Sequence, residues 1–222
     1  MRVAPLHSSE MVSELLWGEP FEVIDIKEDS WKKIKVTLDN YEGWIEYKGK
    51  LYSPNSSEHQ VFVPDSDLVT GKFTNLYPGS ILYSSEDFIS SRQKPNKIDL
   101  SLLDLLMEKY LGAPYYWGGK TTRGIDCSGL VQVIYRCLGL NLWRDASQQA
   151  EMGEAIDFDK RQKGDLAFFK NSTGKVIHVG IVLNNNGIIH ASGKVRVDKL
   201  HESGIFNVDT KKYSHKLSLI KR

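Results

Sequence analysis

The sequence contains few cysteines and no long apolar run, and each absence excludes a class of protein. Only Cys127 and Cys137 occur among its 222 residues. Two cysteines are too few for the disulfide framework of a small secreted domain. No window approaches the roughly 18 apolar residues that a membrane-spanning helix needs. The composition, with 41% hydrophobic and 26% charged residues, is that of an ordinary globular protein.

The two cysteines are expected to be free thiols. On one helix, which rises about 1.5 Å per residue, residues 127 and 137 would lie roughly 15 Å apart. A disulfide requires Cα atoms within about 7 Å of each other. Free thiols suit a reducing compartment.

An excess of one charge sign is also missing. The chain has 29 basic and 28 acidic side chains and a formal net charge of +1. This balance gives no electrostatic reason to expect nucleic acid or a membrane surface as a partner. The N-terminal segment contains no apolar core of a secretory signal. We therefore expect a cytoplasmic protein, or a periplasmic or extracellular one if a signal peptide has been removed from this sequence.

The first half is rich in short β-type runs. Alternating segments at 20–26, 31–38 and 44–47 are separated by the turn-forming stretches KEDS and DNYEG. Strands this short, with turns between them, are typical of a small barrel. A second set of similar runs follows up to residue 85. We predict one small barrel over residues 1–49 and a second, divergent one over residues 50–92.

The second half changes to helices followed by strands. Apolar spacing predicts a helix from Ile98 to Tyr110 and another from Cys127 to Gly139, with Asp126 as its N-cap. A short helix is expected near residues 147–153. Strands are predicted at 165–170, 176–184, 187–192, 194–198 and 216–222. Residues 96–222 thus predict an α+β domain in which helices pack on an antiparallel sheet.

The stretch GIDCSGLV, residues 124–131, suggests a nucleophile. A cysteine in the first turn of a helix lies at the positive end of the helix dipole, which lowers the thiol pKa. The apolar face of the same helix would hold the sulfur on a rigid element, as a nucleophile requires. A buried apolar cysteine is the alternative, and it is our interpretation of Cys137, which lies mid-helix.

Two of the six histidines, His178 and His190, lie inside strongly apolar strands. They can share a face if the turn between the strands has an odd number of residues, or if a strand contains a bulge. A three-residue loop, 184–186, that pairs Leu183 with Gly187 satisfies this condition. We assign His178 as the base for Cys127 and His190 as the residue that orients His178. A zinc site is the alternative, but no CxxC or HExxH pattern is present, so we expect no metal and no cofactor.

These motifs together resemble those of a known family. The segments PYYWGGKTTRGIDCSGLVQ, RDASQQ, GDLAFF, HVGIVL and IIHASGKVR are similar to the NlpC/P60 cysteine peptidases, in the family's order, over residues 100–222. The resemblance implies a papain-like fold and a Cys127–His178–His190 triad. One departure is Leu142-Trp143, where the family has leucine-proline before the RDASQQ motif. In the first half, SEMVSELLWGE and DNYEGWI resemble a bacterial SH3-like (SH3b) domain.

The combination is similar to γ-D-glutamyl-L-diamino acid endopeptidases of the dipeptidyl-peptidase VI type. These enzymes cut peptidoglycan stem peptides between γ-linked D-glutamate and the diamino acid. The resemblance implies that the first SH3-like domain blocks one end of the cleft and so demands a free N-terminal L-alanine. It therefore suggests L-Ala-γ-D-Glu-diamino acid as the substrate and murein peptide recycling as the role.

The resemblance also implies binding residues. Tyr115 and Asp126 correspond to residues at the substrate's amino end, and Ser128 and Ser147 to positions near the D-glutamate carboxylate. Tyr41 would close the amine pocket, with Glu10 as its acidic partner and Glu19 as the alternative. A plain N-cap for Asp126 and strand packing for Tyr41 remain equally open.

Three further expectations complete the interpretation. The backbone N–H of Cys127 would be an oxyanion donor, together with the Tyr115 hydroxyl. Arg144 is expected to brace its neighbour Asp145. The functional alternatives are an amidase or acyltransferase on the same fold, and a non-hydrolytic module that binds the cell wall.

Overall fold

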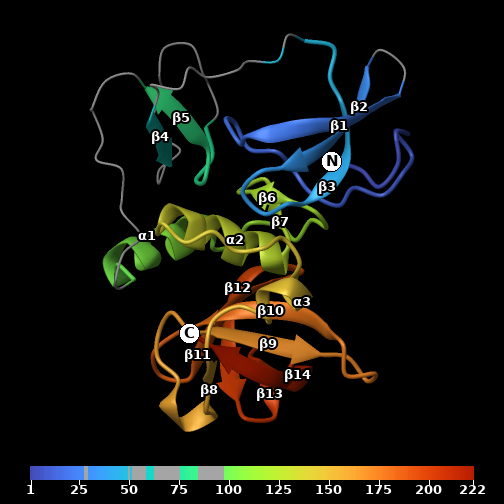
Figure 1. The fold of residues 1–222 in the computed structure, drawn as a ribbon. Coiled ribbons are helices and arrows are strands. Elements are labelled where there is room, and N and C mark those ends of the chain that lie inside the picture. The colour runs from blue at the N-terminus through green and yellow to red at the C-terminus, as the bar shows by residue number, and fades with distance from the viewer. Residues whose placement is uncertain (28–29, 50, 52–58, 63–75, 85–97) are drawn as a thin grey trace.

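The structure is a computed structural model that describes residues 1–27, 30–49, 51, 59–62, 76–84 and 98–222. Figure 1 shows three parts along the molecule. A small N-terminal sheet lies at one end, two longer helices cross the middle, and a C-terminal barrel lies at the other end. No helix in the described ranges is long and apolar enough to cross a bilayer.

The N-terminal sheet has three antiparallel strands in sequence order. They are β1 (Phe21–Lys27), β2 (Trp31–Val36) and β3 (Glu42–Glu46), so the three predicted runs do form strands. In β2 the buried side chains are Trp31, Ile34 and Val36. The second predicted barrel, residues 50–92, falls largely outside the described residues. Within it, β4 (His59–Phe62) pairs with β5 (Ile81–Ser84).

The helices agree closely with the sequence pattern. Helix α1 covers Leu100–Tyr110, and the Asp99 carboxylate caps it by accepting from two backbone N–H groups of its first turn. Helix α2 covers Cys127–Cys137 and is buried along its whole length. Helix α3 is a single turn, Ala146–Gln149, shorter than expected. A short hairpin, β6 (Lys120–Thr121) and β7 (Gly124–Ile125), precedes α2.

The C-terminal sheet closes into a barrel, whereas the sequence predicted only an antiparallel sheet. The strand order is β13-β12-β11-β10-β9-β14, and β13 also pairs with β14, which closes the ring of six. All five predicted strands form, although the last two are longer than expected, and β13 was missed because GIFN is too short to show an alternating pattern. The strands are β9 (Leu166–Lys170), β10 (Val176–Val182), β11 (Gly187–Ser192), β12 (Lys194–His201), β13 (Gly204–Asn207) and β14 (Lys212–Lys221). A further strand, β8 (Ala155–Ile156), pairs with β14, and a 3-10 turn, Phe158–Lys160, follows it.

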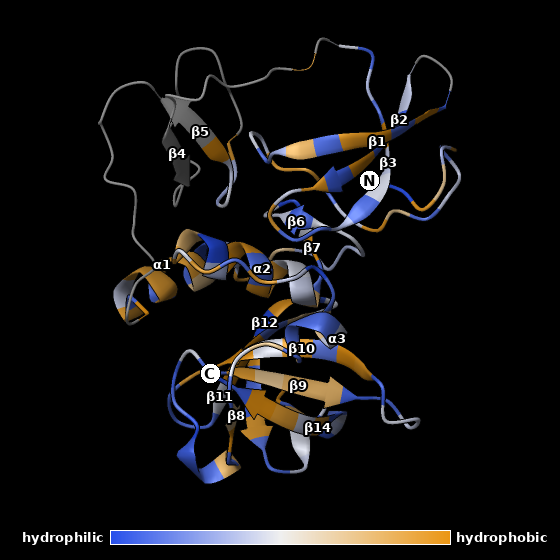
Figure 2. Ribbon diagram, in the orientation of Figure 1, coloured by the Kyte–Doolittle hydropathy of each residue, from blue (hydrophilic) through white to orange (hydrophobic). Residues whose placement is uncertain are grey.

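Alternation along the strands separates two apolar clusters. Phe169 belongs to a cluster that includes Val182, Leu200 and Ile205 and fills the barrel. Its neighbour Phe168 belongs to the cluster that packs against α1 and α2. Figure 2 shows hydrophobic residues along β9 and β14. The packed barrel therefore gives rigid support to the side chains that its strands carry.

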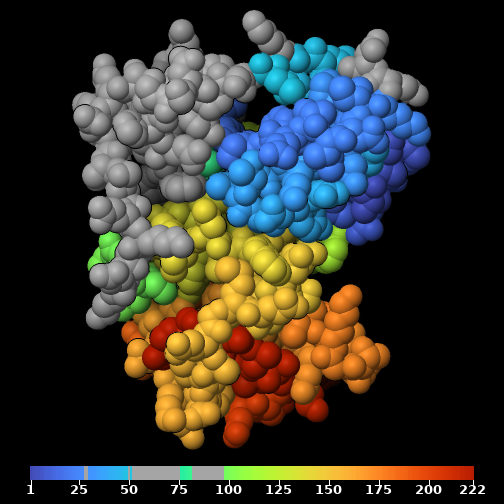
Figure 3. Space-filling model, in the orientation of Figure 1, coloured from blue at the N-terminus to red at the C-terminus, as the bar shows by residue number. Residues whose placement is uncertain are grey.

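Buried polar contacts join the N-terminal sheet region to the C-terminal half. Glu19 binds Lys120 Nζ at 2.6 Å and also pairs with Arg136, and all three side chains are almost completely buried. Gln132 of α2 donates to Asp39 at 2.8 Å. Figure 3 shows the N-terminal segment seated directly on the segment that contains α2 and α3. Such pairs fix the relative position of two elements better than they add stability.

Candidate active site

Cys127 lies where the start of α2 meets β10. The Asp126 carboxylate accepts from the backbone N–H of Gly129 at 2.7 Å, so Asp126 is the N-cap, as predicted. A side chain at Gly129 would overlap the carbonyl oxygen of Gly119, which explains the glycine there. The Cys127 sulfur accepts from the backbone N–H groups of Val179 and Ser128. The sulfur therefore lies beside the residue that follows His178.

The thiol of Cys127 is protonated in the free protein. Burial raises its pKa to about 12, and the negative charge of Asp126 acts in the same direction. The hydrogen bonds from Val179 and Ser128 oppose this shift without overcoming it. The expectation that the helix start lowers the pKa is thus wrong, because desolvation outweighs the helix dipole here. Reaction of this thiol requires a base. Both cysteines are free, as expected.

The strand register brings the two predicted histidines together. The loop 184–186 has the expected three residues, with Asn185 and Asn186 at positive φ and Leu183 paired to Gly187. As a result His178 Nε2 lies 2.8 Å from His190 Nδ1. Both imidazoles are buried. The predicted odd-length loop and the shared face are therefore confirmed.

A carboxylate that the sequence analysis missed extends this pair. His190 Nε2 lies 3.0 Å from Asp198 Oδ2 on β12. Arg196 donates to the same carboxylate at 2.7 Å, and Val208 N–H donates at 2.9 Å. Its only signal in the sequence was an acidic residue in the strand that follows the strand of His190. We call His178, His190 and Asp198 the histidine chain.

The histidine chain fixes the tautomers of both rings. Because an ionised Asp198 can only accept, His190 donates from Nε2 and its Nδ1 accepts from His178 Nε2–H. The nitrogen of His178 that can take a proton is then Nδ1. Burial, with the neighbouring His215 and His190, holds the pKa of His178 well below its usual value. Burial also lowers the pKa of His190 to about 4, against the opposing effect of Asp198. Both rings are neutral at neutral pH, the state that a general base needs.

Arg144 forms a second buried group next to the helix start. It donates to both oxygens of Asp126, at 3.0 and 2.5 Å, to Ser128 Oγ at 2.9 Å and to Ser13 Oγ at 3.0 Å. The expectation that Arg144 braces Asp145 is therefore wrong, because its hydrogen-bonding fork faces Asp126 instead. We call Arg144, Asp126, Ser128 and Ser13 the Arg144 cluster.

The carboxylate of Asp126 is fully occupied by this cluster. Besides the Arg144 bonds it accepts from Gly129 N–H and from Gly118 N–H at 2.8 Å, and from Ser128 Oγ at 3.2 Å. These contacts match the N-cap interpretation of Asp126. The hydroxyl of Ser128 is likewise held inside the cluster, where it is buried.

Tyr41 lies at the same boundary between the two halves. Its half-buried phenol donates to the carboxylate of Asp145, and burial together with that charge raises the pKa of Tyr41 to about 12. Tyr115 is close to Cys127: burial, together with the neighbouring Cys127 and Asp126, raises the pKa of Tyr115 to about 12. Both hydroxyls therefore keep their protons and can donate. Asp145 was not predicted as a site residue.

The remaining predicted residues have separate positions. Glu19 is enclosed in its ion pairs with Lys120 and Arg136, so it is not the acidic partner of an amine pocket. The two cations lower the pKa of Glu19 although burial alone would raise it. Glu10 is exposed, and Ser147 is half-buried on α3, which packs against β10. Their proposed roles remain predictions.

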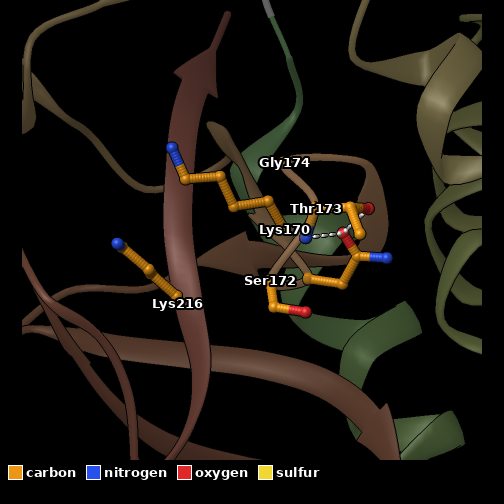
Figure 4. Close-up of a pocket in the computed structure, with 6 residues that line it drawn as sticks. Lys170, Ser172, Thr173, Gly174 and Lys216 are labelled. Atoms are coloured by element: carbon orange, nitrogen blue, oxygen red, sulfur yellow. Dashed lines mark hydrogen bonds between the residues drawn. The ribbon is translucent and has the colours of Figure 1, made fainter.

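A surface hollow of about 420 Å³ lies at the turn between β9 and β10. Figure 4 shows Lys170 and Lys216 on one side of it and the β-turn on the other. Asn171 stabilises the turn by accepting from Thr173 at 2.8 Å and from Lys175 N–H at 3.0 Å. None of the predicted site residues lines this hollow. Within the described residues, no three His, Cys, Asp or Glu side chains are grouped to hold a metal ion.

Comparisons with known proteins identify the family of both halves of the chain. Residues 112–213 match the NlpC/P60 family, and residues 1–49 match the bacterial dipeptidyl-peptidase Sh3 domain. A probable endopeptidase NlpC homolog from Haemophilus influenzae is 32% identical over 142 residues, covering 63% of this chain and 75% of that protein. The chain belongs to the NlpC/P60 family.

Two further relatives span both halves of this NlpC/P60 protein. A gamma-D-glutamyl-L-lysine dipeptidyl-peptidase from Bacillus cereus is 28% identical over 232 residues, covering 83% of this chain and 68% of that protein. The crystal structure of an NlpC/P60 family protein from Bacillus cereus has a TM-score of 0.73 at 23% identity. It covers 95% of this chain and is itself covered to 81%, so the two share a fold.

Proposed function

We propose that this NlpC/P60 protein is a cysteine peptidase that cleaves the γ-D-Glu–diamino acid bond of peptidoglycan stem peptides. The observation that carries the proposal is the histidine chain, whose first member, His178, directly precedes the residue whose backbone N–H donates to the Cys127 sulfur. Its hydrogen bonds of 2.8 and 3.0 Å leave Nδ1 of a neutral His178 as the base. The similarity to a gamma-D-glutamyl-L-lysine dipeptidyl-peptidase over both halves supports the substrate class.

The reaction begins with proton transfer. His178 Nδ1 takes the proton of Cys127 Sγ as the sulfur attacks the γ-carbonyl carbon of D-glutamate. The backbone N–H of Cys127 and the Tyr115 hydroxyl stabilise the oxyanion. The C–N bond then breaks, and the imidazolium returns the proton to the departing amine. Water, deprotonated by the same nitrogen, attacks the thioester and releases the γ-carboxylate and the free thiol.

The high pKa of the resting thiol favours a general-base route, in which His178 takes the proton only as the sulfur attacks. A thiolate–imidazolium ion pair in the resting enzyme is disfavoured. Burial disfavours both the thiolate and the imidazolium. The negative charge from the thiol and the positive charge on His178 would form together only when bound substrate and the oxyanion donors stabilise them. Asp198 helps by stabilising positive charge that spreads along the histidine chain.

Selectivity for a free amine would come from the boundary between the two halves. A free α-amine is cationic below a pKa of about 8. Asp145, held by Tyr41, offers it a partly accessible carboxylate, while the Asp126 oxygens already bind Arg144 and three other donors. We infer that Tyr41 and Asp145, with Glu10 as a further acidic candidate, bind the N-terminal L-alanine. Asp126 would contribute mainly by shaping the site, and Ser147 would face the D-glutamate carboxylate.

Product analysis tests this function. L-Ala-γ-D-Glu-L-Lys and its meso-diaminopimelate analogue are incubated with the protein and analysed by mass spectrometry. The proposal predicts L-Ala-D-Glu and the free diamino acid. Transfer of the dipeptide to an added amine would indicate an acyltransferase, and binding to peptidoglycan without cleavage would indicate a binding module. Either outcome contradicts the proposal.

Blocking the amine tests the specificity. N-acetylation of the peptide should lower kcat/KM about tenfold or more, because it removes a charge-assisted contact. Tyr41→Phe should reduce this preference while leaving the melting temperature unchanged. Equal turnover of both peptides by the unmodified protein would remove the amine pocket from the account.

A further inference from the structure

A third histidine, from a strand separated from β10 only by β9, contacts His178. The ring of His215, on β14, stacks on the His178 ring with centroids 4.1 Å apart and planes 18° apart. The His190 ring meets His178 edge-on at 5.0 Å, and Phe169 lies at 5.8 Å. Three rings therefore surround the imidazole that serves as the base.

The backbone is irregular at both stacked histidines. In β10 the pairing with β9 jumps from Val176 to His178, which leaves Ile177 as an extra residue. In β14 the pairing with β13 jumps from Tyr213 to His215, which leaves Ser214 extra. A bulge of this kind redirects the neighbouring side chain and is common beside active sites. Each bulge directly precedes one of the two histidines.

The close approach of β13 to β14 supports the same position. A Cβ at Gly204 would overlap the carbonyl oxygen of His215, and Gly204 has a φ of 139°. Glycine is required there because only it accepts both the contact and this backbone angle. The glycine in β13 thus lets the backbone of His215 in β14 approach closely.

We propose that His215 is a positioning residue that covers one face of the His178 imidazole and holds its Nδ1 toward Cys127. The hydrogen bond to His190 fixes one atom of that ring, but the plane can still turn about the bond. A parallel ring at stacking distance opposes this rotation. The inference depends on the proposed role of His178 as base.

The groups around His215 are consistent with a neutral ring. Its charged or titratable neighbours are His178 on β10, His190 on β11 and Asp198 on β12, and Ser214 Oγ lies 2.9 Å from His215 Nδ1. Burial lowers the pKa of His215, while Asp198 acts to raise it. A neutral ring can stack on His178 without repelling the imidazolium that forms during the reaction.

The test measures the reactivity of Cys127 without any peptide substrate. Iodoacetamide alkylates the sulfur with loss of iodide, and peptide mapping separates Cys127 from Cys137. His215→Phe keeps a flat ring, whereas His215→Leu fills similar volume without one. We expect alkylation between pH 6 and 8 to stay within about twofold for the Phe variant and to slow about two- to tenfold for the Leu variant, the rate equivalent of one aromatic pair.

Two controls separate this inference from the function on which it depends. His178→Ala should slow alkylation more than either His215 variant, and wild-type reactivity there would refute both the base and the role of His215. A slow His178→Ala variant with wild-type rates for His215→Leu would refute the role of His215 alone. Equal slowing of the Phe and Leu variants would also contradict ring stacking. With substrate, the Leu variant should lose kcat and keep KM, since His215 does not bind the peptide.

Discussion

The histidine chain and the Arg144 cluster are both buried polar groups, yet they are built in different ways. The histidine chain comes from three adjacent strands of one barrel, β10, β11 and β12. The Arg144 cluster joins residues as distant as Ser13 and Arg144, from opposite halves of the chain. The comparison indicates that strand register within the barrel brings His178, His190 and Asp198 together, whereas docking of the N-terminal half completes the Arg144 cluster. Chemistry and selectivity can then be altered separately.

Removing the Cys127 sulfur should give the largest loss of activity of all the changes considered. Cys127→Ala should lower kcat by at least about 10³-fold, because the neighbouring Ser128 hydroxyl is held by Arg144 and Asp126 and cannot replace the thiol. The fold should persist, since the side chain is small. Assays at equal concentrations of folded protein measure the loss. Cys137→Ala is the matched control and should retain its turnover, whereas wild-type activity in Cys127→Ala would exclude thiol catalysis.

Breaking the Arg144 cluster should chiefly cost stability. Arg144→Met leaves the buried Asp126 carboxylate without its cation, which should lower the free energy of unfolding by about 3–5 kcal/mol. Urea unfolding followed by tryptophan fluorescence measures this change. Lys160→Met removes an exposed ion pair with Asp157 and should leave the midpoint unchanged. Equal midpoints for both variants would show that the cluster does not hold the two halves together.

Shortening the histidine chain should chiefly cost rate. Asp198→Asn keeps the shape but can no longer enforce the tautomer of His190, so kcat should fall about 10–100-fold with KM little changed. Steady-state kinetics on the tripeptide measures both constants. Asp209→Asn, which also faces Arg196 but not His190, serves as the control. A large change in KM with constant kcat would place Asp198 in binding instead.

The stability of the protein should depend on pH through the histidine chain. The pKa of His190 is about 4 in the folded protein, against an ordinary value of 6.5. Between these pH values only the unfolded chain takes up the proton, so stability is full above pH 6.5 and falls as the pH is lowered toward 4. His190→Asn should make this slope shallower by up to about 1.4 kcal/mol per pH unit. Parallel slopes for the two proteins would contradict a buried, neutral His190.

The same contrast explains what the sequence could predict. The helix of Cys127 and the strands of His178 and His190 follow from local periodicity. The three-residue loop follows from the requirement that both histidines lie on one face of the sheet. Closure of the sheet could not be predicted, because it depends on the short β13. The partner of Arg144 could not be predicted either, since Asp145 is its neighbour in sequence whereas Asp126 is its neighbour in space.

The environments of Cys127 and Glu19 have one physical cause. The pKa of Cys127 was predicted from its place at the helix start, and Glu19 was the alternative acidic partner that the resemblance implied, yet both groups are enclosed by the docking of one element on another. Desolvation then dominates the pKa of the Cys127 thiol, and Lys120 and Arg136 form ion pairs with the Glu19 carboxylate. Asp198 and His215 escaped notice because each becomes significant only where neighbouring strands of the barrel meet.

The most direct test of the central claim is to trap the acyl-enzyme. Wild-type protein is mixed rapidly with L-Ala-γ-D-Glu-L-Lys, quenched in acid and digested, and its peptides are mapped by mass spectrometry. The account predicts an L-Ala-D-Glu acyl group joined by a thioester to Cys127, formed no more slowly than lysine is released. Release of lysine with Cys127 unmodified at every time point, and at the same rate in Cys127→Ala, would contradict it.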